Sequence, residues 1–461
     1  MINTSEDEGA VVVHEDLNPY GPSRVPEGEV YRPDRLNRKA TLAAIVGAAI
    51  LAFAFALVLW MGLKQTNLPA FGPSNVTRAV ASATIAAVLI VTGFLTWLWL
   101  RDEHQSNPRW ELEDVKPRPK WRTALTYLAS YLSPAALVVA VLAIPLSATR
   151  LYLDGISVDQ GFRTQFLTRM ADDIGLSDMN YIDMPTFYPA GWFWLGGRLA
   201  NLLGLPGWEA FQPWAIVSMA VAASVLVPVW QRITGSLPVA TGIALVTTCI
   251  ILAMNSEEPY AAIVAMGIPA MLVLASRIAK GDKFALASGI IYLGVSATFY
   301  TLFTGAIALS AVAVCIVMAA IVQRSIKPLL WLAVLGGGSI VIALISWGPY
   351  LLASINGAER SGDSATHYLP LEGTQFPVPF LASSVVGLLC LVGLIYLVVR
   401  FHNNEVRAMW VGIAVFYAWM GMSMAITLLG NTLLGFRLDT VLVLIFATAG
   451  VLGIDRKSTR L

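Results

Sequence analysis

Charged residues are scarce in this sequence, and their scarcity excludes an ordinary soluble domain. Asp, Glu, Lys and Arg make up 13% of the 461 residues, whereas soluble domains carry roughly 25%. The apolar residues fall in blocks of roughly 20 residues, the length of a helix that crosses a hydrocarbon core of about 30 Å. Because lipid offers the backbone no hydrogen-bond partners, such segments must be helical. The sequence therefore predicts an all-α membrane protein.

Cysteine is also rare, and its placement limits the chemistry available to the chain. The three cysteines, Cys249, Cys315 and Cys390, all lie inside apolar blocks, so we expect neither a disulfide framework nor a cysteine metal site. The formal net charge of +1 gives no indication of a nucleic-acid partner. We predict no metal and no cofactor.

Ionisable residues are almost absent from the apolar blocks themselves. Proton-coupled and ion-coupled transporters use carboxylates or basic residues at mid-membrane depth. The acidic residues gather instead in the segment 150–211. This distribution indicates chemistry at the membrane face, on a substrate that is presented there.

The apolar blocks predict a polytopic bundle of about twelve transmembrane helices. We place them at residues 42–63, 78–100, 123–149, 212–230, 237–254, 260–278, 284–302, 303–322, 328–354, 380–400, 407–430 and 437–454. Within 284–322, which has no charged residue, only the stretch from Thr298 to Thr304 suits a turn. The spans define one membrane domain, residues 42–454.

Two polar ends flank this domain. Residues 1–41 are rich in Glu, Pro and Arg, which indicates a disordered cytoplasmic leader. No cleavable signal peptide is visible, so the first apolar block is expected to remain as an anchor. Residues 455–461 form a short polar tail.

The positions of Lys and Arg predict the orientation of the spans. If the helices alternate, one side receives the leader, a basic loop at 101–122 and several later basic turns. The opposite side receives the turn 255–259, which has no basic residue, and the loop 355–379, which has one. Cytoplasmic loops carry the excess of Lys and Arg. We therefore predict a multi-pass protein of the plasma membrane with its N-terminus inside and segment 150–211, between the third and fourth helices, outside.

The outer segment 150–211 holds seven acidic residues and four arginines. Within it, Phe162, Phe166, Leu167 and Met170 recur at helical spacing, which predicts a short helix in the membrane interface with its apolar side toward lipid. Tryptophans 192, 194 and 208 follow and are expected at headgroup level.

Three runs within this segment resemble a known family. They are DQGFRTQ at 159–165, MADDIGL at 170–176 and YPAGWFW at 188–194. The order of an acidic residue after a helix and a Pro-containing stretch before the next helix is similar to GT-C glycosyltransferases. The runs themselves resemble the actinobacterial galactan arabinofuranosyltransferases, although YPA stands where other GT-C branches have His-Pro-Pro. Members of that family continue into a soluble domain on the outer face, so the resemblance implies that this chain is truncated.

The resemblance implies a glycosyltransferase that moves arabinofuranose from decaprenylphosphoryl arabinose to the galactan of the cell-wall arabinogalactan, with membrane lipid around it. The leaving polyprenyl phosphate needs no proton, so one carboxylate suffices to deprotonate the acceptor hydroxyl. Asp159 is the candidate base, and attack from the opposite face would invert the anomeric centre. Arginine suits a phosphate through its planar set of donors, and Arg163 and Arg437 are the candidates. Asp172, Asp173, Tyr188 and Trp192 are further substrate-binding candidates.

Each of these residues also has a purely structural interpretation. Asp159 could cap the interfacial helix, because Asp is a favoured N-cap residue. Asp172 and Asp173 could lie in a solvated turn, and Arg437 could extend to the interface as an anchor. Trp192 could be a headgroup anchor. Glu257 and Glu258 are expected in a solvated outer turn.

Two other functions compete with the glycosyltransferase. One is a transporter or flippase for a polyprenyl-linked precursor, which inverted repeats and buried charges would favour. The other is a non-catalytic scaffold for wall assembly, in which no single outer Asp would matter. The acidic loop with its family motif favours the enzyme.

The predicted orientation can be tested by cysteine labelling. Ser177→Cys should react with a membrane-impermeant thiol reagent in intact cells, whereas Ser106→Cys should react only after the membrane is permeabilised. The background should lack the three native cysteines. Equal labelling of both positions in intact cells would contradict the topology.

Overall fold

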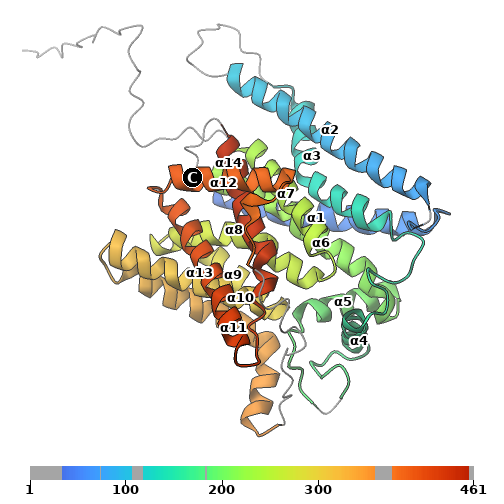
Figure 1. Ribbon diagram of the computed structural model, residues 1–461. Coiled ribbons are helices and arrows are strands. Elements are labelled where there is room, and N and C mark those ends of the chain that lie inside the picture. Colours follow the sequence, from blue (N-terminus) through green and yellow to red (C-terminus); the bar gives the residue numbers. More distant parts are fainter. Residues whose placement is uncertain (1–33, 73, 106–117, 182–183, 359–375, 456–461) are drawn as a thin grey trace, which may run out of the picture. The chain divides into compact units, whose positions relative to one another are not determined.

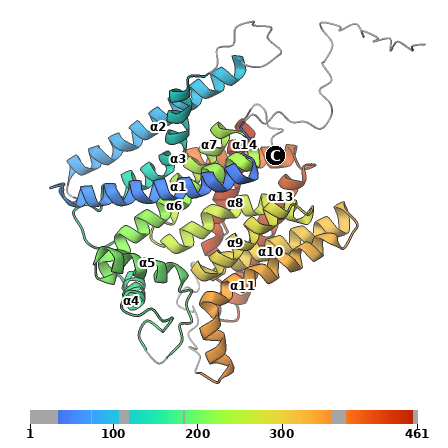
Figure 2. The same cartoon turned by 180° about the vertical axis from the view of Figure 1, so that it is seen from behind.

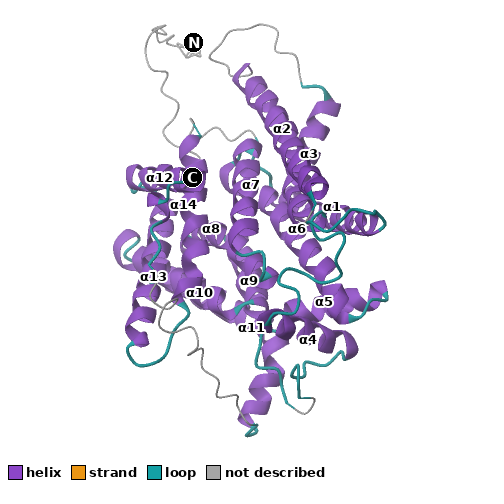
Figure 3. Cartoon of the chain, turned by 45° about the vertical axis from the view of Figure 1, so that its right-hand side comes forward, coloured by secondary structure: helices purple, strands orange, loops and turns teal. Residues whose placement is uncertain are grey.

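The computed structural model describes residues 34–72, 74–105, 118–181, 184–358 and 376–455. These residues are built from helices, and no strand occurs among them apart from one isolated bridge between Ser177 and Pro185 (Figure 3). Most of the expected leader and all but the first residue of the expected tail lie outside the described ranges. The all-α prediction is confirmed.

The helices follow one another in the order shown in Figure 1. They are α1 (Arg38–Lys64), α2 (Asn75–Gln105), α3 (Lys120–Val138) continued by η1 (Val139–Ala143), α4 (Val158–Asp172), α5 (Gly191–Leu203), α6 (Gly207–Thr234), α7 (Leu237–Met254), α8 (Pro259–Ala279), α9 (Lys283–Phe299), α10 (Thr301–Val317) continued by η2 (Met318–Val322), α11 (Lys327–Ile355), η5 (Pro379–Leu381), α12 (Val385–Val399), α13 (Asn404–Thr427), η6 (Gly435–Leu438) and α14 (Asp439–Ile454).

Every one of the twelve predicted spans coincides with a helix. Within the described part of the chain, ten helices are long and apolar enough to cross a membrane. The other two, α9 and α12, are apolar but have only 17 and 15 residues. The protein is therefore a multi-pass membrane protein. The break predicted between Thr298 and Thr304 occurs at Tyr300, whose extended backbone (φ −153°, ψ 108°) separates α9 from α10.

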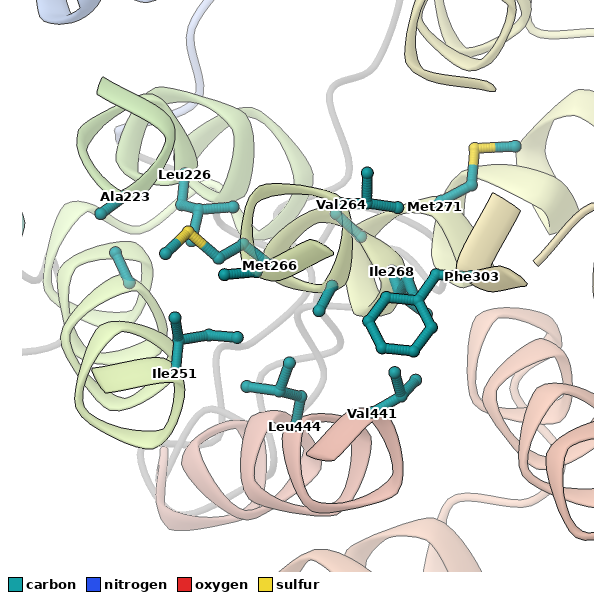
Figure 4. Close-up of a cluster of buried hydrophobic side chains, with 14 of the residues drawn as sticks. Ala223, Leu226, Ile251, Val264, Met266, Ile268, Met271, Phe303, Val441 and Leu444 are labelled. Atoms are coloured by element: carbon teal, nitrogen blue, oxygen red, sulfur yellow. The ribbon is translucent and has the colours of Figure 1, made fainter. Parts of the chain in front are cut away.

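The core lies where α6, α7, α8, α10 and α14 meet. Figure 4 shows Leu226 of α6, Ile251 of α7, Met266 of α8, Phe303 of α10 and Leu444 of α14 pointing toward one another. The peripheral helices are different, because only 17% of the most apolar window of α1, α2 and α11 is buried. From behind, α1 runs across α3 and α6 (Figure 2). The exposed apolar faces of the peripheral helices suit contact with lipid.

Contacts between the ends of α1, α2, α6 and α7 agree with the prediction that successive spans alternate in direction. Just before α1, the carboxylate of Asp34 accepts hydrogen bonds from Trp99 Nε1 of α2 and from the backbone N–H of Leu237, the first residue of α7, each at 3.1 Å. The side chain of Gln231, near the end of α6, donates to the backbone carbonyl of Asp34 at 3.0 Å. The start of α1, the end of α2, the end of α6 and the start of α7 therefore lie on one side.

Helix α4 forms where the sequence predicts a short helix, but its environment differs from the prediction. Phe166, Leu167 and Met170 are each 0% exposed, and Phe162 packs edge-on against Tyr188. Their face lies against α5 and the start of α6 rather than lipid. The expectation of a lipid-facing apolar side is wrong, because helical periodicity identifies a buried face without showing what covers it.

Helices α4 and α5 approach each other closely at Gly197. A Cβ atom on this residue would lie 2.4 Å from the carbonyl oxygen of Met170 in α4. Real Cβ atoms do not come that close to a backbone oxygen, so only glycine allows this approach. By contrast, a Cβ atom on Gly161 of α4 would meet no heavy atom within 4 Å.

Replacing these two glycines by alanine should have opposite effects on stability. Gly197→Ala should destabilise the protein by about 1–3 kcal/mol, because the added methyl pushes α4 away from α5. Gly161→Ala should leave stability unchanged or raise it by about 0.5–1 kcal/mol, because alanine restricts the unfolded chain. Thermal unfolding of the purified variants in one detergent would measure both. Identical melting temperatures would contradict the close packing of α4 on α5.

Candidate functional site

Arg163 projects from the buried face of α4 and is held on several sides. Its side chain is 5% exposed. Nη2 donates to Glu258 Oε1 at 2.7 Å, and Nε donates to the hydroxyl of Tyr260 at 3.1 Å. Nη1 reaches the backbone carbonyl of Glu257 at 3.4 Å. These contacts fix the guanidinium between α4 and the start of α8.

Glu258 binds a second arginine from the far end of the sequence. Arg437, in η6, donates from Nη1 to both carboxylate oxygens of Glu258, at 2.6 and 2.7 Å. The Glu258 side chain is only 12% exposed. It also occupies the N-cap position of α8, where the positive end of the helix dipole stabilises a carboxylate. One buried carboxylate thus joins two guanidiniums, which leaves one positive charge in excess among these three groups.

Three tyrosine hydroxyls complete the polar cluster. Tyr260 accepts from Arg163, and the hydroxyl of Tyr188 donates to that of Tyr260 at 3.2 Å. Tyr300, in the break between α9 and α10, accepts from Arg437 Nη1 at 3.3 Å. Burial, followed by the nearby Tyr260, raises the pKa of Tyr188 well above its ordinary value. Tyr188 therefore stays neutral and can donate a hydrogen bond.

Asp159 stands at the exposed edge of this cluster. One of its carboxylate oxygens is 3.7 Å from Arg163 Nη2, and its side chain is 58% exposed. The alternative that Asp159 caps the helix does not fit, because the N-cap residue of α4 is Ser157 and the helix begins at Val158. Asp159 is thus an accessible carboxylate beside a buried guanidinium.

Two more carboxylates, Asp154 and Glu257, lie on the same acidic edge. Desolvation raises the pKa of Glu257, and the nearby Asp154 carboxylate raises it further. Asp154 has a positive φ of 61°, an uncommon conformation for a residue other than glycine. The buried part of the cluster is therefore basic and its exposed edge is acidic.

The remaining predicted site residues lie elsewhere. Asp172 and Asp173 are at the end of α4, 13 and 14 residues beyond Asp159, which corresponds to about 20 Å along a helix. Asp173 accepts a hydrogen bond from the backbone N–H of Gly175 at 3.0 Å, which suits their structural interpretation as a loop turn.

Trp192 is 0% exposed and donates from Nε1 to Ser218 Oγ at 3.1 Å. It packs against Phe211 and Tyr260 in the core. The expectation of a headgroup anchor is wrong, and direct contact with a substrate does not fit this position. An apolar ring that anchors to lipid and one that fills the core look alike in sequence.

Sequence reasoning missed Glu258, Tyr260 and Tyr300. Glu258 was expected in a solvated turn, yet it lies at the centre of the cluster. The signal for it was indirect: two arginines on the predicted outer side need an acidic partner, and the turn 255–259 supplies acids at that side. In the part of the chain that the structure describes, no three His, Cys, Asp or Glu side chains are arranged to hold a metal ion.

The chain is similar to a group of actinobacterial proteins. A family model described as the N-terminal part of arabinofuranosyltransferases matches residues 44–460. A galactan 5-O-arabinofuranosyltransferase of Corynebacterium glutamicum is 99% identical over 438 residues, which make up 95% of this chain and 66% of that protein. A protein of the same name from Mycolicibacterium smegmatis is 38% identical over 420 residues, or 89% of this chain and 64% of its own length. The chain thus spans a little less than two thirds of the length of these relatives.

The role of Glu258 can be separated from that of its neighbour in the chain. Glu258→Gln should destabilise the protein by about 3 kcal/mol, because it leaves the buried guanidinium of Arg163 and the partly buried one of Arg437 without their shared carboxylate. Glu257→Gln is the matched control: this acid is exposed, and loss of its repulsion with Asp154 should not lower the melting temperature at neutral pH. Thermal unfolding of both variants would decide the matter. Equal losses would contradict a bridging role for Glu258.

Proposed function

Because the chain belongs to the family defined by the N-terminal part of arabinofuranosyltransferases, we propose that it is the membrane-embedded part of a galactan 5-O-arabinofuranosyltransferase. It would transfer arabinofuranose from decaprenylphosphoryl arabinose to galactan. The observation that carries this proposal is the juxtaposition of an accessible carboxylate, Asp159, with the buried Arg163 and the partly buried Arg437. The reaction needs both a proton acceptor and a cation for the leaving phosphate.

Arg163 and Arg437 suit the donor phosphate. Together they carry two positive charges against the single buried carboxylate of Glu258. A guanidinium offers five N–H donors in one plane, so contact with Glu258 does not exhaust them. The two guanidiniums would bind the donor phosphate and stabilise the negative charge that develops on the departing polyprenyl phosphate. In this proposal Glu258 holds both arginine side chains in the orientation that lets them bind one phosphate.

Asp159 suits the role of the base. It is four residues before Arg163 on α4, so both side chains lie on the same side of the helix, and its carboxylate is exposed. An acceptor hydroxyl that donates to Asp159 would lie close to a sugar whose phosphate is held by Arg163. Attack on the anomeric carbon from the side away from the phosphate would invert its configuration.

The outer face of the plasma membrane is the proposed location of the reaction. The site lies at the start of α4, the start of α8 and η6, and the turn 255–259 between α7 and α8 contains no Lys or Arg. Loops on the cytoplasmic side are the ones enriched in these residues. A site on the outer face would also meet the galactan of the wall.

The substitution Asp159→Asn tests the activity and the base together. It keeps the shape of the side chain and removes its ability to take a proton, so transfer should fall by about a hundredfold or more while donor binding persists. Membranes containing each variant would be incubated with labelled decaprenylphosphoryl arabinose and a galactan acceptor, and donor binding would be measured in parallel.

Asp172→Asn is the matched control, because it removes an exposed carboxylate from the far end of the same helix. Its transfer rate should stay near that of the unaltered protein. No transfer by the unaltered protein would refute the proposed activity. Near-normal transfer by Asp159→Asn would refute the assignment of the base and leave Asp154 and Glu257 as the nearest alternatives.

A further inference from the structure

A cavity lies apart from the arginine cluster. Its volume is about 280 Å³, and it opens between the end of α1, the turn that joins α5 to α6, and the first turns of α6. Neither Arg163, Glu258 nor Arg437 lines it. Nothing in the proposed transfer reaction requires this cavity.

The inner wall of the cavity is a fixed, neutral surface. Trp60 Nε1 donates to Gln212 Oε1 at 2.9 Å, and Gln212 Nε2 donates to the backbone carbonyls of Thr149 at 3.0 Å and Leu151 at 2.7 Å. The amide of Gln212 and the indole N–H of Trp60 already have protein partners. Recognition of a polar ligand would therefore fall to the charged residues at the opening.

Those residues carry a net positive charge. Arg150 forms a bidentate ion pair with Glu209, at 2.9 and 2.5 Å. Lys64 donates to the backbone carbonyls of Leu146 and Thr149, and no carboxylate of the described residues lies within ion-pair distance of its ammonium. An ammonium has three N–H donors. Two cations and one carboxylate leave one positive charge, which favours an anionic ligand.

The cavity also lies at the ends of two membrane-spanning helices, where lipid headgroups are expected. Lys64 is the last residue of one membrane-spanning helix, and Gly207 is the first residue of another. Exposed apolar side chains continue from the opening, since Met61 is 49% and Leu202 is 78% exposed. A ligand that satisfies both features has an anionic head and a hydrocarbon chain.

We propose that this cavity binds a phosphate-bearing membrane lipid. The phosphate contacts Lys64 and the outer side of Arg150, and the hydrocarbon chain lies along Met61 on the lipid-facing side of α1. Two lipids present this chemistry: an anionic phospholipid of the bilayer and a polyprenyl phosphate. The site stands whether or not the protein transfers arabinofuranose.

Binding here would stabilise a segment that leads to the candidate active site. Lys64 and Gln212 donate to the carbonyls of Leu146, Thr149 and Leu151. The residue that follows Leu151, Tyr152, donates from its hydroxyl to the carbonyl of Ser256 at 2.7 Å. Ser256 immediately precedes Glu257 and Glu258. A lipid on Lys64 therefore stabilises the backbone between the cavity and the ion-paired cluster.

The experiment compares three lipids by native mass spectrometry of the purified protein. Phosphatidylglycerol and decaprenyl phosphate carry the phosphate, whereas diacylglycerol has the hydrocarbon chains without it. At least one phosphate lipid should bind, and diacylglycerol should not. Preference for phosphatidylglycerol would identify the bilayer as the source, and preference for decaprenyl phosphate would identify the polyprenyl pool. Equal binding of diacylglycerol would overturn the proposal.

Two variants and a control locate the binding. Lys64→Gln should lower the affinity for the phosphate lipid about tenfold, which is the loss expected for one charge-assisted hydrogen bond. Arg78→Gln is the control, because Arg78 is a cation near the start of α2, on the same predicted side of the membrane, that does not line the cavity. Leu203→Trp keeps all the charges, fills the cavity and should also weaken binding. Unchanged affinity in Leu203→Trp, or equal losses in Lys64→Gln and Arg78→Gln, would overturn the proposal.

Discussion

Glu258 meets two guanidinium groups from distant parts of the chain, and the arrangement of the candidate site depends on this contact. Arg163 comes from α4, Arg437 from η6, and Glu258 itself stands at the start of α8. A buried carboxylate is costly unless it is paired, so each partner makes the position of the others favourable. The hydroxyls of Tyr260 and Tyr300 accept hydrogen bonds from the arginines without adding charge. The two ion pairs of Glu258 thus join residues of α4, α8 and η6 in one polar cluster within an otherwise apolar protein.

The fold was largely predictable because a single physical requirement, the absence of backbone partners in lipid, acts on every span. All twelve predicted segments are helices, and the break near Tyr300 was found from the lack of any other turn. The environment of α4 was not predictable. Its apolar face has the same periodicity whether lipid or protein covers it, and only the fold shows that α5 and α6 do so.

Only the contacts of the site between residues that are close in the sequence were predictable. The proximity of Asp159 and Arg163 follows from a spacing of four residues on a helix, and the structure places them 3.7 Å apart. The contacts of Glu258 join residues separated by 95 and 179 positions. Such pairs leave no periodic signal in one sequence, so Glu258 resembled any solvated turn residue. The prediction that Trp192 is a headgroup anchor was wrong for a related reason. The side chains around Trp192 come from α6 and α8, which are distant in the sequence.

The shortness of α9 and α12 has a consequence for the surrounding bilayer. Helices of 17 and 15 residues extend about 26 and 23 Å, less than a hydrocarbon thickness of roughly 30 Å. Such hydrophobic mismatch is relieved by local thinning of the membrane or by tilting of neighbouring elements. Since α9 ends beside Tyr300, which accepts a hydrogen bond from Arg437, thinning of the membrane around α9 would occur next to the arginine cluster. A phosphate carried by a lipid could then reach these arginines while its chain remains in the leaflet.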